Sequence, residues 1–302
     1  MTYKPFFRRE AEANGEIPDV WTYDTLPKNI RVQIWQTFMS TNDIYYVRQM
    51  SETICNFLRH EIGLEHLSTH SYKYNYSCWD YAEELKEFFY TEKYDYRFAL
   101  SVVECMLRIL NNGTPNNKES HIKYIKEINY RLKEARIGYE FNTDANMLIK
   151  KSDEAVYQLS IEPAFHLLSD LKFKESIDNF AKAFSDYQSG NPKDLENAIT
   201  NALKALESTI KNICKLKGYE FNEEKPLKDQ VAVLKNQKFL PEKYNNYFDK
   251  ITDLIIAVAT PRNKTTGHGQ SDEAADTVDE KLVEFVLAQV ASVIVFLTKN
   301  SK

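Results

Sequence analysis

The chain has 302 residues, of which 43% are hydrophobic and 27% charged, and its net charge is -5. This length suffices for one large or two ordinary domains, and the low counts of glycine and proline disfavour an all-β fold with many tight turns. The acidic balance argues against bulk nucleic-acid affinity, which needs a basic surface, although it leaves room for a small basic cleft.

The sequence pattern predicts neither a signal peptide nor a membrane-spanning segment. The charged stretch Met1–Glu12 lacks an apolar signal core, and no apolar run is long enough to span a bilayer. The four cysteines are scattered, without the spacing of a metal or redox site, and are interpreted as reduced thiols. We therefore expect a cytoplasmic protein with no membrane contact, no metal and no cofactor.

Helical spacing of apolar residues begins near Pro27 and continues to about Ala135. The aromatic stripes within this part are interpreted as core. We expect residues 1–135 to form an N-terminal helical domain.

The apolar period then changes from helical to alternating. Ile137, Tyr139 and Phe141 alternate with other residues, a turn follows at 142–146, and apolar residues resume at 147–149. This pattern predicts a short β-hairpin that joins two domains over residues 136–152.

Residues 153–302 are predicted to form a helical bundle. Its first apolar face is interrupted by Pro163. A long helix begins at Asn191 and ends at Gly218, where a glycine suits the end of a helix. A later helix stops before Pro261, whose ring cannot continue it, and Ser271 is a candidate N-cap of the last one. The fold class is therefore mainly α.

The polar loop Pro261–Gly269 is the strongest functional signal, because it combines an arginine and a histidine between two apolar helices. His268 could take or give a proton near neutral pH. Arg262 could bind phosphate oxygens as charge builds on them. Together they provide what a metal-free enzyme needs to cleave RNA by attack of a 2′-hydroxyl on the adjacent phosphorus.

The other residues of this loop could support the same chemistry. Asn263 could orient the phosphate, and Lys264 adds a second positive charge. Gly267 and Gly269 lack a Cβ and would let the backbone approach the substrate. The alternative is an ordinary loop between two helices.

A charged stripe on the long helix is a second candidate. Lys204, Glu207, Lys211 and Lys215 share one face of the helix. In one interpretation Glu207 holds His268 or Arg262 while the lysines guide the RNA backbone. In the other, the stripe is solvated and contains a Glu207–Lys211 ion pair.

The loop resembles the signature of the HEPN superfamily, in which an arginine and a polar residue precede a histidine. With Ala205–Lys211, which reads ALESTIK, it resembles more closely the C-terminal domain of AbiJ-like bacterial abortive-infection proteins. Phe7–Arg9, Ile30–Trp35, the hairpin and Glu162–Ala164 are similar to the remainder of that architecture. Thr260–Pro261, before the arginine, departs from it.

The resemblance implies a metal-independent endoribonuclease toxin that stops the growth of a phage-infected bacterium. It implies Arg262 and His268 as the catalytic pair, Asn263 as their polar neighbour and Glu207 as the acidic helper. It also implies a homodimer formed through the C-terminal domain, with RNA as substrate and an antitoxin or phage trigger as a further partner. The rival hypothesis is a non-catalytic dimeric sensor that binds RNA or a phage protein.

Overall fold

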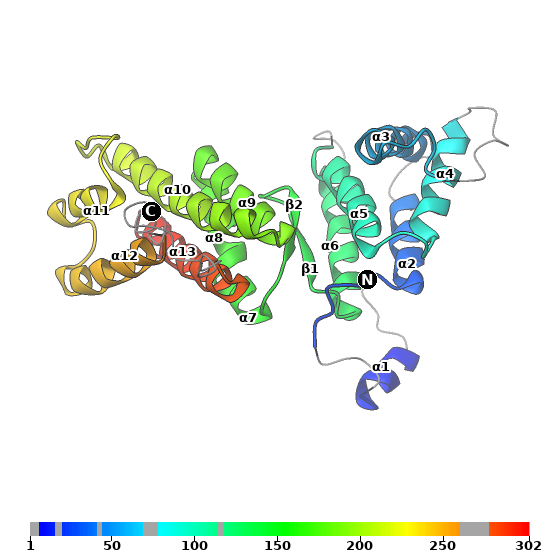
Figure 1. Cartoon of the computed structure of the whole chain (residues 1–302), viewed down its shortest axis with the longest axis horizontal. Helices are drawn as coiled ribbons and strands as arrows, with labels where there is room; N and C mark the ends of the chain where they lie inside the picture. The colour runs from blue at the N-terminus through cyan, green and yellow to red at the C-terminus, as the bar shows by residue number, and fades with distance from the viewer. Residues whose placement is uncertain are drawn as a thin grey trace, which may run out of the picture. The chain divides into compact units, whose positions relative to one another are not determined.

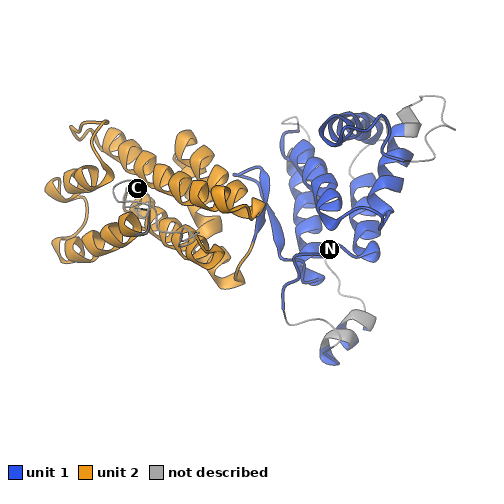
Figure 2. Cartoon of the chain, viewed as in Figure 1, with its two compact units in different colours: residues 1–150 blue, residues 151–302 orange. Residues whose placement is uncertain are grey.

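The computed structural model describes residues 6–15, 20–40, 44–68, 78–113, 118–259 and 278–301. The chain divides into two compact units, residues 1–150 and 151–302, and each is built mainly from helices (Figures 1 and 2). The predicted mainly α fold is confirmed. The hairpin predicted as a separate joint lies within the first unit.

The first unit contains helices and one antiparallel hairpin. Its elements are α1 (Phe6–Ala13), α2 (Lys28–Met39), α3 (Ile44–Ile62), α4 (Cys78–Tyr90), α5 (Tyr96–Asn111), α6 (Lys118–Glu134), β1 (Tyr139–Asn142) and β2 (Met147–Lys150).

The core of the first unit is rich in aromatic residues. Trp35, Phe38, Phe88 and Phe89 are all buried, as the sequence pattern predicted. Trp35 packs against Phe38 with a centroid distance of 5.7 Å. Partly buried tyrosines, among them Tyr90 and Tyr94, pack against this core.

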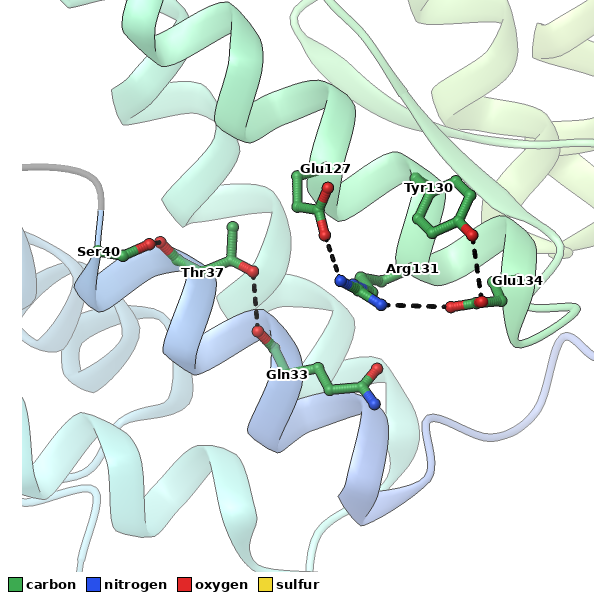
Figure 3. A network of polar contacts seen from close by, with 7 residues as sticks. All are labelled: Gln33, Thr37, Ser40, Glu127, Tyr130, Arg131 and Glu134. Atoms are coloured by element: carbon green, nitrogen blue, oxygen red, sulfur yellow. Dashed lines mark hydrogen bonds and ion pairs between the residues drawn. The ribbon is translucent and has the colours of Figure 1, made fainter. Parts of the chain in front are cut away.

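Several polar side chains near the contact of α2 with α6 bond within their own helix (Figure 3), while the Tyr124 hydroxyl of α6 donates to the Ser40 carbonyl at the end of α2. On α6, Arg131 contacts Glu127 and Glu134, and the Tyr130 hydroxyl donates to Glu134 at 3.2 Å. On α2, the Thr37 hydroxyl donates to a backbone carbonyl one turn earlier. The charge of the arginine is thus balanced locally, and we assign this cluster no ligand.

The second unit begins with an irregular helical segment and continues as a bundle. Its elements are α7 (Glu154–Val156), the π-helical turn η3 (Tyr157–Ile161), α8 (Glu162–Asp170), α9 (Lys174–Ser189), α10 (Pro192–Lys217), α11 (Leu227–Asn236), the 3₁₀ turn η4 (Glu242–Tyr244), α12 (Asn245–Ala259) and α13 (Glu280–Ser301).

Helix α10 is the central helix of the second unit and contacts α9, α11, α12 and α13. Asn191 caps its start by accepting a hydrogen bond from the Lys193 amide, and Gly218 ends it with φ of +69°. The apolar stripe of this helix is buried and consists of Leu195, Ala198, Ala202, Leu206, Ile210 and Ile213. Ala198 and Ala202 are fully buried, and their small side chains suit the close packing of α10 among its neighbouring helices.

Two predictions about this unit need adjustment. Pro163 does not break the helical segment, which runs without a gap from α7 through the π-helical turn η3 into α8, with the proline as the second residue of α8. The last helix begins at Glu280, and the Asp279 carboxylate accepts a hydrogen bond from the Lys281 amide. The candidate cap Ser271 lies outside the described residues.

Helix α13 corrects the expectation that no apolar run could span a bilayer. Among the described residues it alone has the required length and composition, with a mean hydropathy of 1.9 in its most apolar window. However, 56% of that window is buried within the protein. Val286, Val290 and Ile294 are among the residues that pack inward. A core helix of a bundle passes the same test, so the helix is weak evidence for membrane insertion.

Candidate functional site

The predicted catalytic loop follows α12 in the second unit. The structure describes α12 to Ala259 and resumes at Val278, just before α13. The predicted residues Arg262, Asn263, Lys264, Gly267, His268 and Gly269 therefore lie outside the described residues. Glu207, Lys211 and Lys215 are described, and all three lie on α10.

The carboxylate of Glu207 lies on the side of α10 that faces α11. Its neighbour in sequence, Ser208, is buried and donates to Ser176 on α9 at 3.0 Å. Because consecutive residues of a helix point about 100° apart, α9 contacts one face of α10 while Glu207 remains available on another. The side chain of Glu207 is 33% exposed.

Glu207 and Lys211 form an ion pair with an Nζ–Oε1 distance of 2.8 Å. This is the i,i+4 pair that one interpretation of the stripe predicted. Both side chains are partly buried, so the pair is less screened by solvent than a fully exposed one. This contact places Lys211 beside the carboxylate of Glu207. That Lys211 binds RNA remains a prediction.

Lys215 contacts a carboxylate that the sequence analysis did not single out. Its Nζ lies 2.8 Å from Oε1 of Glu223, in the connection between α10 and α11. The hydrogen bond from Lys215 lowers the pKa of Glu223, and the charge of Lys211 lowers it further. Both members of the pair are more than half exposed, so its contribution to stability is small.

Gln230, on α11, is the residue that sequence reasoning missed. Its side chain is buried, and Nε2 donates to the Lys225 carbonyl at 2.7 Å and to Oε1 of Glu207 at 3.3 Å. The signal in the sequence was a polar residue among the buried positions Leu227, Val231 and Leu234 of a short amphipathic helix. Its partner could not be read from the sequence, because Glu207 lies 23 positions earlier.

A small pocket of about 180 Å³ lies beside this contact. It is lined by Asn222, Lys225, Asp229, Gln230 and Val233. Four of these five residues are polar or charged, but the atoms that they present to the pocket are mainly apolar. The pocket thus adjoins the face of α10 that carries the acidic residue of the predicted site.

Thiol chemistry is disfavoured in this unit. Cys214, on α10, is buried and unpaired, and burial raises the pKa of its thiol to about 11. The thiolate, which is the reactive form, is therefore scarce at neutral pH. The candidate site rests on its carboxylate and cationic groups.

The helical second unit is matched by the family model of a HEPN-like domain over residues 174–301, which runs from the first residue of α9 to the end of α13. The matched range contains both Glu207 and the Arg262–His268 motif. The class of the second unit is therefore a HEPN-like helical domain.

The first part of the chain is matched over residues 4–166 by the family model of AbiJ N-terminal domain 4, which covers more than half of the sequence. The chain belongs to this family and is an AbiJ-like abortive-infection protein with a HEPN-like C-terminal domain. No curated protein and no solved structure matches it significantly. The predicted resemblance is confirmed, and abortive infection is the process with which these domains associate the chain.

Proposed function

We propose that this protein is a metal-independent endoribonuclease that acts as a toxin in abortive infection. The observation that carries the proposal is that one HEPN-like domain contains the Arg262–His268 motif together with Glu207, an acidic side chain held on the face of α10 beside α11. The substrate is RNA, because the proposed chemistry uses the 2′-hydroxyl as nucleophile.

In this mechanism the 2′-oxygen loses its proton, attacks phosphorus and expels the 5′-oxygen, which gains a proton. The products are a 2′,3′-cyclic phosphate and a free 5′-hydroxyl. His268 transfers the proton, and Arg262 stabilises the charge on the non-bridging oxygens. Glu207 orients one of these cationic groups, and Asn263 orients the phosphate.

The remaining predicted residues bind substrate. Lys264, Lys211 and Lys215 provide positive charge for the RNA backbone. Gly267 and Gly269 permit close approach of the loop to the ribose-phosphate. Binding by Lys211 and Lys215 requires that RNA phosphates compete with Glu207 and Glu223, the carboxylates that they contact in this structure.

We further propose that the protein is a cytoplasmic homodimer that associates through the second unit. Exposed apolar side chains on that unit support self-association: Tyr247 and Leu254 lie two turns apart on α12, and Phe285 lies on α13. Their exposed fractions are 64%, 44% and 44%.

The test compares the wild type with His268→Ala and Arg262→Ala in sequencing of RNA ends after brief induction. We expect new 5′-hydroxyl ends and growth arrest with the wild type only, and a melting temperature that is nearly unchanged in the variants. Cleavage of total RNA by the purified protein is expected to continue in EDTA. Full activity in either variant would overturn the catalytic assignment, and loss of activity in EDTA would favour a metal nuclease.

A non-catalytic sensor is the second candidate. It is favoured by the net charge of -5 and by the ion pairing of Lys211 and Lys215 with carboxylates, which reduces the positive charge available to RNA. Such a protein would bind RNA or a phage protein without turnover. RNA that stays intact after incubation with the protein, together with a specific partner recovered by pull-down, would support the non-catalytic sensor.

A further inference from the structure

Helix α11 anchors its inner face to α10 mainly through apolar side chains, but Gln230 places an amide among them. Burying an amide costs free energy unless its hydrogen bonds are replaced. Leucine at this position would fill a similar volume without that cost. The amide therefore needs an explanation other than packing.

The hydrogen bonds fix the orientation of this amide. Both partners within reach of Nε2, the Lys225 carbonyl and the Glu207 carboxylate, are acceptors, so the nitrogen and not the oxygen must face them. The opposite atom, Oε1, is buried and has no hydrogen-bond partner among the described residues. The amide is thus oriented so that Oε1 has no partner among the described residues, while Nε2 donates to Glu207 and to the Lys225 carbonyl.

Two donors from two helices converge on one oxygen of Glu207. Lys211 lies one turn further along α10, and Gln230 comes from α11. Both contacts are made to Oε1, and no described residue donates a hydrogen bond to Oε2. Holding Oε1 from two directions restricts the side-chain rotamer and leaves Oε2 as the oxygen that can accept from a further group.

We propose that Gln230 is a positioning residue for Glu207 in the ribonuclease site. This inference rests on the proposed function, since Glu207 is the acidic helper of the Arg262–His268 pair. Gln230 touches neither RNA nor the reacting atoms. It acts by directing the carboxylate, so the packing of α11 on α10 determines whether the site is competent.

The test uses Gln230→Met, which keeps the length and apolar stem of the side chain but removes the donor. We expect kcat for RNA cleavage to fall about tenfold or more, because small errors in the position of a catalytic group are costly, and KM to change less than about twofold since substrate contacts remain. The matched control is Lys235→Met, also on α11. It removes the 2.6 Å contact between Lys235 and Asp249 of α12 and leaves Glu207 untouched.

A double-mutant cycle separates positioning from structural damage. In a Glu207→Gln background, Gln230→Met should lower kcat by less than about twofold further, because the residue through which it acts is already altered. A full multiplicative loss in that background would overturn the proposal. So would an equal loss from Lys235→Met, or unchanged kcat in Gln230→Met.

The same data distinguish failure of this inference from failure of the proposed function. Wild-type protein that does not cleave RNA refutes the ribonuclease, and the inference fails with it. Cleavage that depends on His268 but is unaffected by Glu207→Gln leaves the ribonuclease standing and refutes the role of Gln230. Melting temperatures of all variants, measured alongside, should stay close to that of the wild type.

Discussion

Asn129 on α6 holds the backbone of Phe141 on β1 through two hydrogen bonds. Its Nδ2 donates to the Phe141 carbonyl, and its Oδ1 accepts from the Phe141 amide, both at 2.9 Å. Glu104 on α5 accepts from the Leu148 amide of β2 at 3.1 Å. The hairpin is therefore attached to helices of the first unit by side chains that satisfy its backbone, which explains why it belongs to that unit.

Asn129→Ala is expected to loosen the hairpin locally. It removes both hydrogen bonds and leaves two partly buried backbone groups unpaired, at a cost of about 2 kcal/mol. Hydrogen exchange measured by mass spectrometry should show roughly tenfold faster exchange, or more, in peptides that cover residues 137–150. Asn112→Ala, at an exposed position, is the control and should leave that exchange unchanged. Equal protection in both variants would contradict the role of Asn129.

Arg31 is expected to be sensitive even to substitution by lysine. The buried guanidinium donates to three backbone carbonyls, those of Leu26, Phe89 and Thr91, at 2.6, 3.1 and 2.7 Å. A lysine ammonium cannot reproduce this planar, forked geometry. Arg31→Lys and Arg31→Met should each lower the free energy of unfolding by about 3 kcal/mol.

Tryptophan fluorescence during urea unfolding measures this effect, because all three tryptophans lie within residues 1–150 and report on the first unit. Arg97→Lys is the control, since Arg97 is exposed and pairs with the carboxylate of Asp95 at the surface. A stable Arg31→Lys variant would show that charge alone, without the fork, suffices at this position.

Glu104 should make the first unit less stable as the pH rises. Burial raises the pKa of its carboxyl above the ordinary value of 4.5, although the Leu148 amide and Arg108 oppose the shift. Between the two pKa values the folded chain binds more protons than the unfolded chain, so the free energy of unfolding falls as the pH increases through that range.

Glu104→Gln removes this titration and keeps an oxygen that can accept from the Leu148 amide. Relative to the wild type, its stability should improve from pH 4.5 to neutral pH, as measured by tryptophan fluorescence in urea. Glu119→Gln, at an exposed position on α6, should show no such trend. A relative stability that declines toward neutral pH would contradict the raised pKa.

Glu223→Gln is expected to strengthen RNA binding by freeing Lys215. The measurement is fluorescence anisotropy with a labelled RNA, in a His268→Ala background that prevents cleavage. Affinity should rise severalfold, and the slope of log K against log salt should become steeper by about one unit, as expected for one additional phosphate contact.

Glu224→Gln provides the matched control for this prediction. It makes the same change of charge at the next residue, where the structure shows no contact with a lysine among the described residues. An equal gain in both variants would assign the effect to net charge and not to Lys215.

Local sequence patterns were sufficient to predict most of the helices, because the formation of a helix and the position of its ends depend on residues within a few positions of one another. Asn191 and Gly218 mark α10, and the alternation around Phe141 with its turn marks the hairpin. The stripe on α10 was equally visible, and its Glu207–Lys211 pair followed from a spacing of four residues.

The contacts that complete the candidate site depend on the tertiary structure. Gln230 reaches Glu207, and Glu223 reaches Lys215, only because the chain turns back after Gly218 and brings α11 against α10. Likewise, composition marks α13 as apolar, but only its packing identifies which residues face the bundle. The sequence alone determined the helices, the hairpin and the motif that indicates the family. The three-dimensional arrangement decided which polar groups meet, since hydrogen bonds act over a few ångströms in space and take no account of separation along the chain.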